Sequence, residues 1–181
     1  MFIGSMNTVC GRLWRRIRSN MARFKPPFAA TKKGFSFNLG PEERHVVRRL
    51  IGEVGELLKT SVADDPKMAR LFPPAYSADE EAETEYQRLM RDELVTSRLH
   101  SIQQVEEFLA DDSVSLLTFT QLDAFSASLN SVRLILGTLL GVGEADEDLD
   151  DEDPRTDELA LYNFLSWLLE NAIQALMDSS V

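Results

Sequence analysis

Residues 118–141 read TFTQLDAFSASLNSVRLILGTLLG, and this stretch contains the start, the apolar face and the end of one helix. Thr118-x-x-Gln121 has the spacing of a capping box, in which each of the two side chains accepts a hydrogen bond from the backbone of the other residue. Gly141 follows the last apolar turn, where a glycine commonly ends a helix. Between these ends, apolar side chains recur every three or four residues: Leu122, Phe125, Leu129, Val132, Leu136 and Leu139. This spacing predicts a helix with one face in a protein core.

Similar start signals predict four more helices. Gly40-Pro41-Glu42-Glu43 opens the first of them, because proline fits the first helical turn and acidic residues favour the N-terminal end of the helix dipole. Capping-box spacings open two others, at Ser77-x-x-Glu80 and at Ser101-x-x-Gln104. The last helix begins after Pro154 and is apolar over much of its circumference, so we expect it to be the central, most buried helix.

A short strand pair precedes the helices, within residues 28–39. Phe35, Phe37 and Leu39 alternate with polar residues, which is the pattern of a half-buried strand. Residues 32–34 supply a turn, and residues 28–30 supply the partner strand. Two strands are not stable alone in water, so the hairpin has to pack on the helices. The sequence therefore predicts a mainly α fold, a single helical-bundle domain of about five helices with a short N-terminal β-hairpin.

The distribution of charge divides the chain into parts. Its 181 residues carry a net charge of −11, yet residues 1–33 hold eight basic and no acidic side chains. We therefore predict a flexible basic arm at residues 1–22, a helical domain at 23–178 and, within that domain, an acidic loop at 144–153. The acidic domain would repel phosphate, which excludes a uniformly basic nucleic-acid-binding domain. Residues 12–33 are the only predicted contact with nucleic acid.

The basic arm contains a short amphipathic stretch. In a helix, Leu13 and Ile17 would lie one turn apart, and such a stretch would suit an anionic membrane surface or a row of phosphates. A disordered arm with an isolated tryptophan is the simpler interpretation, and both remain open. The residues that would form an interaction arm are Arg12, Trp14, Arg15, Arg16 and Arg18.

Few residues are available for catalysis or metal binding. The chain has one cysteine, Cys10, and two histidines, His45 and His100, and it contains no nucleophile elbow, phosphate loop or dinucleotide fingerprint. The acidic loop has Asp151 at the position where a calcium-binding loop needs glycine. We therefore predict no enzymatic activity, no cofactor and no metal. Cys10 is the predicted redox residue, and its oxidation is limited to an intermolecular or mixed disulfide or an oxidised thiol.

Hydropathy also bears on location. No apolar run approaches the roughly 18–20 residues that span a bilayer, so the sequence predicts no integral membrane protein. Arginines interrupt the first 21 residues, and no apolar core of a secretory signal is present. We therefore expect a cytoplasmic protein.

One polar cluster stands out among the apolar helices. Arg133 is the only basic residue between Arg98 and Arg155, and Asn130 precedes it by one helical turn. We expect Arg133 to neutralise Glu170 of the last helix in a buried ion pair that fixes the register of the two helices. The functional alternative is a pocket for an anion or a peptide carboxylate.

Seven segments follow one another in a recognisable order: residues 34–58, 64–66, 69–76, 89–94, 129–138, the acidic loop at 144–153, and 162–168. Over roughly residues 23–178 this order resembles a known actinobacterial family, domain-of-unknown-function family twenty-seventeen. The resemblance implies a mostly helical cytoplasmic protein and no catalytic residues. Genes of the family commonly lie beside the gene of the protease adaptor ClpS and near genes of cysteine biosynthesis, and some members are described as transcriptional regulators, notably in oxidative stress.

These observations lead to one preferred function and two alternatives. We expect a non-enzymatic regulatory protein that acts through protein–protein contacts, in transcriptional or oxidative-stress control. The first alternative is an adaptor in ClpS-linked proteolysis, and the second is a small-ligand or metal-binding enzyme built around His45 or Arg133. The predicted partners are accordingly the transcription or the proteolysis machinery, with a homodimer as a further option.

Overall fold

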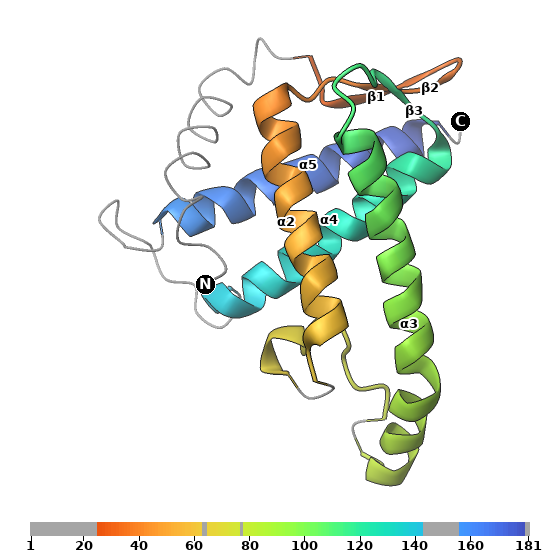
Figure 1. Cartoon of the computed structure of the whole chain (residues 1–181), viewed down its shortest axis with the longest axis vertical. Coiled ribbons are helices and arrows are strands. Elements are labelled where there is room, and N and C mark those ends of the chain that lie inside the picture. The colour runs from red at the N-terminus through yellow and green to blue at the C-terminus, as the bar shows by residue number, and fades with distance from the viewer. Residues whose placement is uncertain (1–24, 63–64, 77, 143–155, 180–181) are drawn as a thin grey trace.

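The computed structural model describes residues 25–62, 65–76, 78–142 and 156–179. Within them the chain is mainly helical, with a small antiparallel sheet near its N-terminal end (Figure 1). The predicted fold class is confirmed, with four α-helices in the described residues. The elements in chain order are β1 (Phe28–Thr31), β2 (Gly34–Phe37), α2 (Pro41–Thr60), the 3₁₀ turn η2 (Pro66–Met68), α3 (Glu80–Leu109), β3 (Leu116–Leu117), α4 (Phe119–Leu140) and α5 (Thr156–Asp178).

Helix α4 lies at the centre of the fold. Both bonds of its predicted capping box are present: the Oγ1 of Thr118 accepts from the backbone N–H of Gln121 at 3.2 Å, and the Oε1 of Gln121 accepts from the backbone N–H of Thr118 at 2.9 Å. Gly141 ends the helix with a φ of 66°, a left-handed conformation that glycine adopts without strain. The helix packs against α2, α3, α5, η2 and β2.

The expectation that the last helix is the most buried one is wrong. Helix α5 packs chiefly against α4 and β1, and its Ile173 is 44% exposed. A helix rich in leucine is stable with only one face covered, so a wide apolar surface does not show that other elements surround the helix.

The predicted hairpin is present and carries a third strand. Phe28 of β1 pairs with Phe37 of β2, and β3 adds to the other edge of β2 through Phe35 and Leu117. Gly34 permits this addition: its φ is 131°, and a Cβ atom there would meet the backbone carbonyl oxygen of Leu117. The sheet packs on the helices through stacked and edge-to-face phenylalanines from both layers: Phe28, Phe37, Phe108 and Phe125.

Helix α3 corrects the predicted break at Ser101. The chain is one continuous helix from Glu80 to Leu109, and the Oγ of Ser101 donates to the carbonyl of Ser97 at 3.3 Å inside it. A serine in a helix interior commonly forms such a bond to the residue four positions earlier, so its pattern with Gln104 does not require a helix start. At the true start, Asp79 is the N-cap and accepts from the backbone N–H of Ala82.

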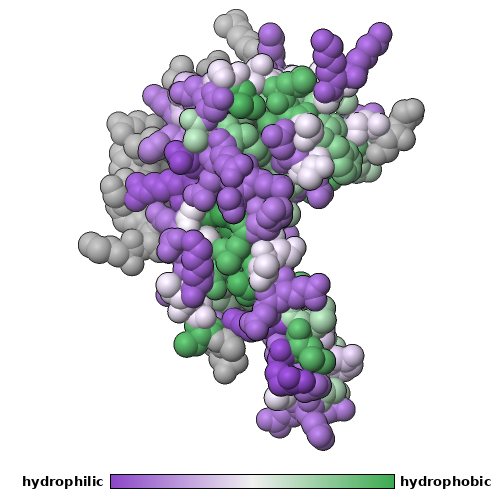
Figure 2. Space-filling model, turned by 45° about the vertical axis from the view of Figure 1, so that its right-hand side comes forward, coloured by the Kyte–Doolittle hydropathy of each residue, from purple (hydrophilic) through white to green (hydrophobic). Residues whose placement is uncertain are grey.

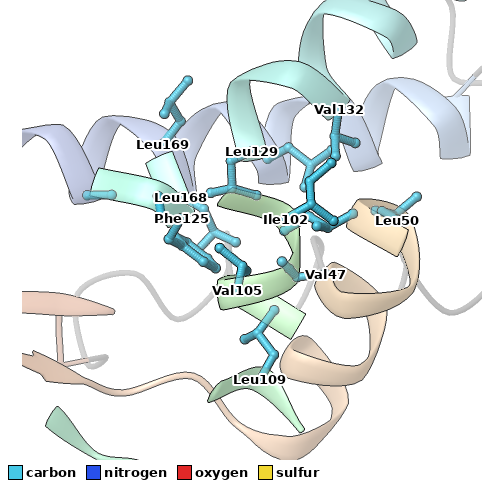
Figure 3. Packing of buried hydrophobic residues seen from close by; sticks show 14 of the residues in the cluster. Val47, Leu50, Ile102, Val105, Leu109, Phe125, Leu129, Val132, Leu168 and Leu169 are labelled. Atoms are coloured by element: carbon cyan, nitrogen blue, oxygen red, sulfur yellow. The ribbon is translucent and has the colours of Figure 1, made fainter. Parts of the chain in front are cut away.

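One hydrophobic core joins the helices and the sheet (Figure 3). Its largest fully buried side chains come from α2, η2, β3, α4 and α5: Phe125, Phe164, Ile51, Met68, Leu117, Leu122, Leu129, Ile135, Leu161, Leu165, Leu168 and Val47. In the described part of the chain, no helix combines the length and the apolar character needed to cross a membrane.

Candidate interaction surface

Several predicted site residues lie outside the described residues. These are Cys10 and the arm residues Arg12, Trp14, Arg15, Arg16 and Arg18, together with the acidic loop at 144–153. The predictions made for the arm, the loop and the cysteine therefore remain predictions.

Arg133 and Glu170 do not form the expected buried pair. The Nε of Arg133 donates to the Oγ of Ser166 at 2.8 Å, and its guanidinium lies 5.4 Å from the centre of the Tyr162 ring. Glu170 is exposed on α5, and Asn130 is half-buried on α4. A serine hydroxyl and an aromatic face already satisfy a half-buried guanidinium, so Arg133 needs no carboxylate in this position.

Among the arginines that the structure describes, Arg44 is the most buried, and it was not predicted from the sequence. It is 5% exposed, and its guanidinium donates to three carbonyl oxygens: to Leu39 from Nε at 3.0 Å, to Asp111 from Nη1 at 2.9 Å and to Val114 from Nη2 at 2.6 Å. It also lies 4.3 Å from the centre of the Phe37 ring. Arg44 therefore ties the start of α2 to the chain between α3 and β3, which is a structural role.

Both histidines are on the surface. His45 is exposed on α2, and His100 is exposed on α3 with its Nε2 3.0 Å from the Nε2 of Gln104. In residues 25–62, 65–76, 78–142 and 156–179, no group of three or more His, Cys, Asp or Glu side chains is placed to hold a metal ion.

The first turns of α3 extend beyond the rest of the molecule (Figure 1). We call residues 80–93 the outer half of α3. None of them is buried, whereas Ile102, Val105, Phe108 and Leu109 at the other end of the same helix are in the core. Figure 2 shows this projection as a largely hydrophilic lobe that carries a hydrophobic patch. Leu89 is 57% exposed here, so the lobe presents apolar area that the fold itself does not cover.

A groove runs between the outer half of α3 and the segment that follows α2. It has a volume of about 740 Å³. Its apolar lining includes the rings of Phe72 and Tyr76, and the guanidinium of Arg91 lies 4.8 Å from the centre of the Phe72 ring. The complete lining is Asp65, Pro66, Met68, Ala69, Phe72, Pro74, Tyr76, Glu80, Glu83, Thr84, Gln87 and Arg91.

Glu83 holds the two walls of the groove together. Its Oε2 accepts from the backbone N–H groups of Ala75 and Tyr76, both at 2.8 Å, and its Oε1 accepts from the Nε2 of Gln87 at 2.6 Å. These hydrogen bonds, first that of Gln87 and then that of Tyr76, lower the pKa of the Glu83 carboxyl from its usual value. Glu83 is therefore ionised at neutral pH and fixes the aromatic wall.

The outer half of α3 is acidic as well as apolar. Residues 79–93 contain seven acidic and two basic side chains. Acidic groups near a helix N-terminus are favoured by the helix dipole, which explains part of this excess. Together with the exposed apolar area, the charge makes this face complementary to a surface that is basic and apolar.

Comparison with known proteins gives one result. The model of the family described as "Domain of unknown function (DUF2017)" matches residues 21–176. No curated protein and no solved structure matches the chain. The match covers all the described helices and strands except the last residues of α5, and the chain therefore belongs to the family described as domain of unknown function (DUF2017).

Proposed function

We propose that this chain is a cytoplasmic, non-enzymatic regulatory protein that binds another protein through the outer half of α3 and the adjoining groove. The observation that carries the proposal is the absence of any buried residue between Glu80 and Glu93 in a helix that continues into the core. Exposed apolar area on such a projection is typical of a protein-binding surface. The partner surface that fits it is basic and apolar.

The groove gives this surface a fixed shape. The rings of Tyr76 and Tyr86 contact each other edge to face at 6.0 Å, and Glu83 holds Tyr76 through its backbone. A wall that is already ordered loses less conformational entropy on binding than a mobile one. A partner helix or an extended segment with an apolar anchor would contact Leu89 and the aromatic wall together.

We propose that this protein–protein contact serves the control of transcription or of the oxidative-stress response. Its basis is the resemblance to regulators in the same family. Adaptor function in ClpS-linked proteolysis is the alternative, and the identity of the bound protein separates the two.

The test is a quantitative comparison of complexes formed by three versions of the full chain in cells that express the protein natively. Leu89→Asp places a charge in the proposed contact, and Ile173→Asp is the matched control, because Ile173 is also an exposed apolar residue but lies on α5. We expect Leu89→Asp to lose the partner that the wild type and Ile173→Asp retain. Equal recovery with both variants would place the contact elsewhere on the molecule.

The same experiment distinguishes the two settings. Subunits of RNA polymerase or another transcription factor among the lost partners support transcriptional control. ClpS or a protease subunit supports the adaptor alternative. Circular dichroism of each variant confirms that its helical content is unchanged.

A further inference from the structure

A second hollow lies between α3 and α4, closer to the core than the groove. It has a volume of about 220 Å³ and is lined by Leu94, Ser97, Arg98, Ser101, Ala127, Ser128 and Ser131. On α3, Leu94, Ser97, Arg98 and Ser101 share one face, because they are spaced three and four residues apart. The lining is therefore a set of hydroxyl groups around one guanidinium, with a small apolar contribution.

Two polar atoms at this hollow are buried without a hydrogen-bond partner. Ser128 is 2% exposed, and its Oγ has no partner. The Nε of Arg98 is also buried and has no partner. Buried polar groups in native proteins are nearly always hydrogen-bonded, so two such atoms at one hollow call for a ligand that accepts hydrogen bonds.

Arg98 has N–H groups that donate no hydrogen bond within the described residues. A guanidinium carries five N–H groups. The Nη1 of Arg98 donates to the Oγ of Ser131 at 3.1 Å, and its Nη2 donates to the carbonyl of Leu71 at 3.3 Å. The remaining N–H groups have no acceptor among the described residues. One face of the guanidinium lies 5.5 Å from the centre of the Phe72 ring, which orients the group without using any donor.

The charge of Arg98 is not neutralised locally. No carboxylate in the described part of the chain forms an ion pair with it, although the protein as a whole is strongly acidic. Burial lowers the pKa of the Arg98 guanidinium, but an arginine keeps its proton in proteins. A half-buried positive charge of this kind attracts an anion.

We propose that the hollow binds a small oxyanion, the phosphate or carboxylate group of a small molecule, held by the guanidinium of Arg98 and the hydroxyl of Ser128. Ser97 supplies a further hydroxyl donor from α3, whereas the hydroxyl of Ser101 already donates to the carbonyl of Ser97. The Nε of Arg98 and the Oγ of Ser128 are shielded from solvent without a ligand. Binding therefore includes rotation of these two side chains toward the anion, a motion that is fast on the timescale of ligand exchange.

The first measurement uses the full chain without variants. Its melting temperature is recorded in chloride, acetate and inorganic phosphate at equal ionic strength, and phosphate and acetate binding is then measured by isothermal titration calorimetry. We expect phosphate or acetate to raise the melting temperature above that in chloride. Because phosphate stabilises folded proteins in general, the calorimetric affinity assigns the group: tighter binding of phosphate indicates a tetrahedral group, and tighter binding of acetate indicates a planar one. Equal melting temperatures in all three salts overturn the proposal.

The second measurement places the anion. Arg98→Lys keeps the charge but loses the planar fork of donors, and Ser128→Ala removes only the hydroxyl. We expect each change to weaken binding of the anion roughly tenfold, the effect of one lost hydrogen bond to a charged group.

Two matched controls lie on α4. Ser126→Ala removes a buried hydroxyl that already donates to the carbonyl of Leu122, and Arg133→Lys alters the half-buried arginine that is bound to Ser166. Both should bind the anion as the wild type does. Unchanged affinity in Arg98→Lys and Ser128→Ala, or equal loss in the controls, overturns the assignment.

Discussion

Replacing Arg44 with methionine should remove much of the stability of this protein. The change keeps most of the aliphatic packing and deletes the guanidinium, which donates to three backbone carbonyls and covers the ring of Phe37. A hydrogen bond from a charged group contributes about 1.5–3 kcal/mol. The carbonyls of Asp111 and Val114 are only partly buried, so water replaces part of that loss, and the buried charge itself no longer has to be desolvated.

We therefore expect Arg44→Met to lower the free energy of unfolding by about 3–4 kcal/mol. For a chain of this length that corresponds to a fall in melting temperature of roughly 10 °C. The assay is urea unfolding followed by circular dichroism, with the slope of the transition compared between variants.

The matched control is Arg49→Met on the same helix. Arg49 forms an exposed ion pair with Glu53 at 3.2 Å, and such pairs contribute about 0–1 kcal/mol. If Arg44→Met is no more destabilising than Arg49→Met, then the three carbonyl contacts do not hold α2 to the loop before β3, and the reasoning is refuted.

Two further predictions concern the corrected features, and a third concerns Glu83. Arg133→Met should lower the free energy of unfolding by only about 1 kcal/mol. Adding Glu170→Leu should have a purely additive effect in a double-mutant cycle, because the two side chains do not pair. Recovery of stability in the double variant would contradict this. Gln103→Pro should lower the free energy of unfolding in urea by about 3 kcal/mol or more, because proline breaks a continuous helix but is accepted in a first turn. A mild effect would indicate that a helix begins at Ser101. The hydrogen bonds from Gln87 and Tyr76 lower the pKa of the Glu83 carboxyl, so its contribution to stability is present above the pKa of an ordinary glutamate and is lost as the pH falls through the lowered pKa. The backbone N–H resonances of Ala75 and Tyr76 should titrate with a midpoint below that of an ordinary glutamate, and they should not titrate in Glu83→Gln.

Features that depend on neighbours in sequence were the ones that could be predicted. The capping box of Thr118 with Gln121, the glycine end at Gly141 and the strand pattern around Phe35 all act within a few residues, and each is present. The break at Ser101 was also a local inference, but the same serine pattern is compatible with a helix interior, and only the packing of the following turn on α4 decides between the two.

Features that depend on contacts between residues far apart in sequence could not be predicted from local patterns. Arg44 is buried because Asp111 and Val114, far away in sequence, present carbonyl oxygens to it. One signal was available: Arg44 lies three and seven residues before Val47 and Ile51, on the apolar face of its helix. Arg98 likewise precedes Ile102 by one turn. An arginine on the apolar face of a helix is thus a useful indicator of a buried guanidinium. The prediction of a buried arginine at Arg133 was wrong.

Helix α3 is one helix in geometry but has two different stabilities. We expect its core end to lose hydrogen bonds only when the whole domain unfolds, whereas residues 80–93 bury no side chain and approach the length at which an isolated helix is marginal in water. Amide hydrogens along this single element should therefore exchange with deuterium at rates that rise steadily toward Glu80. A partner that covers Leu89 should slow this exchange in residues 80–93 and leave the exchange at the core end unchanged.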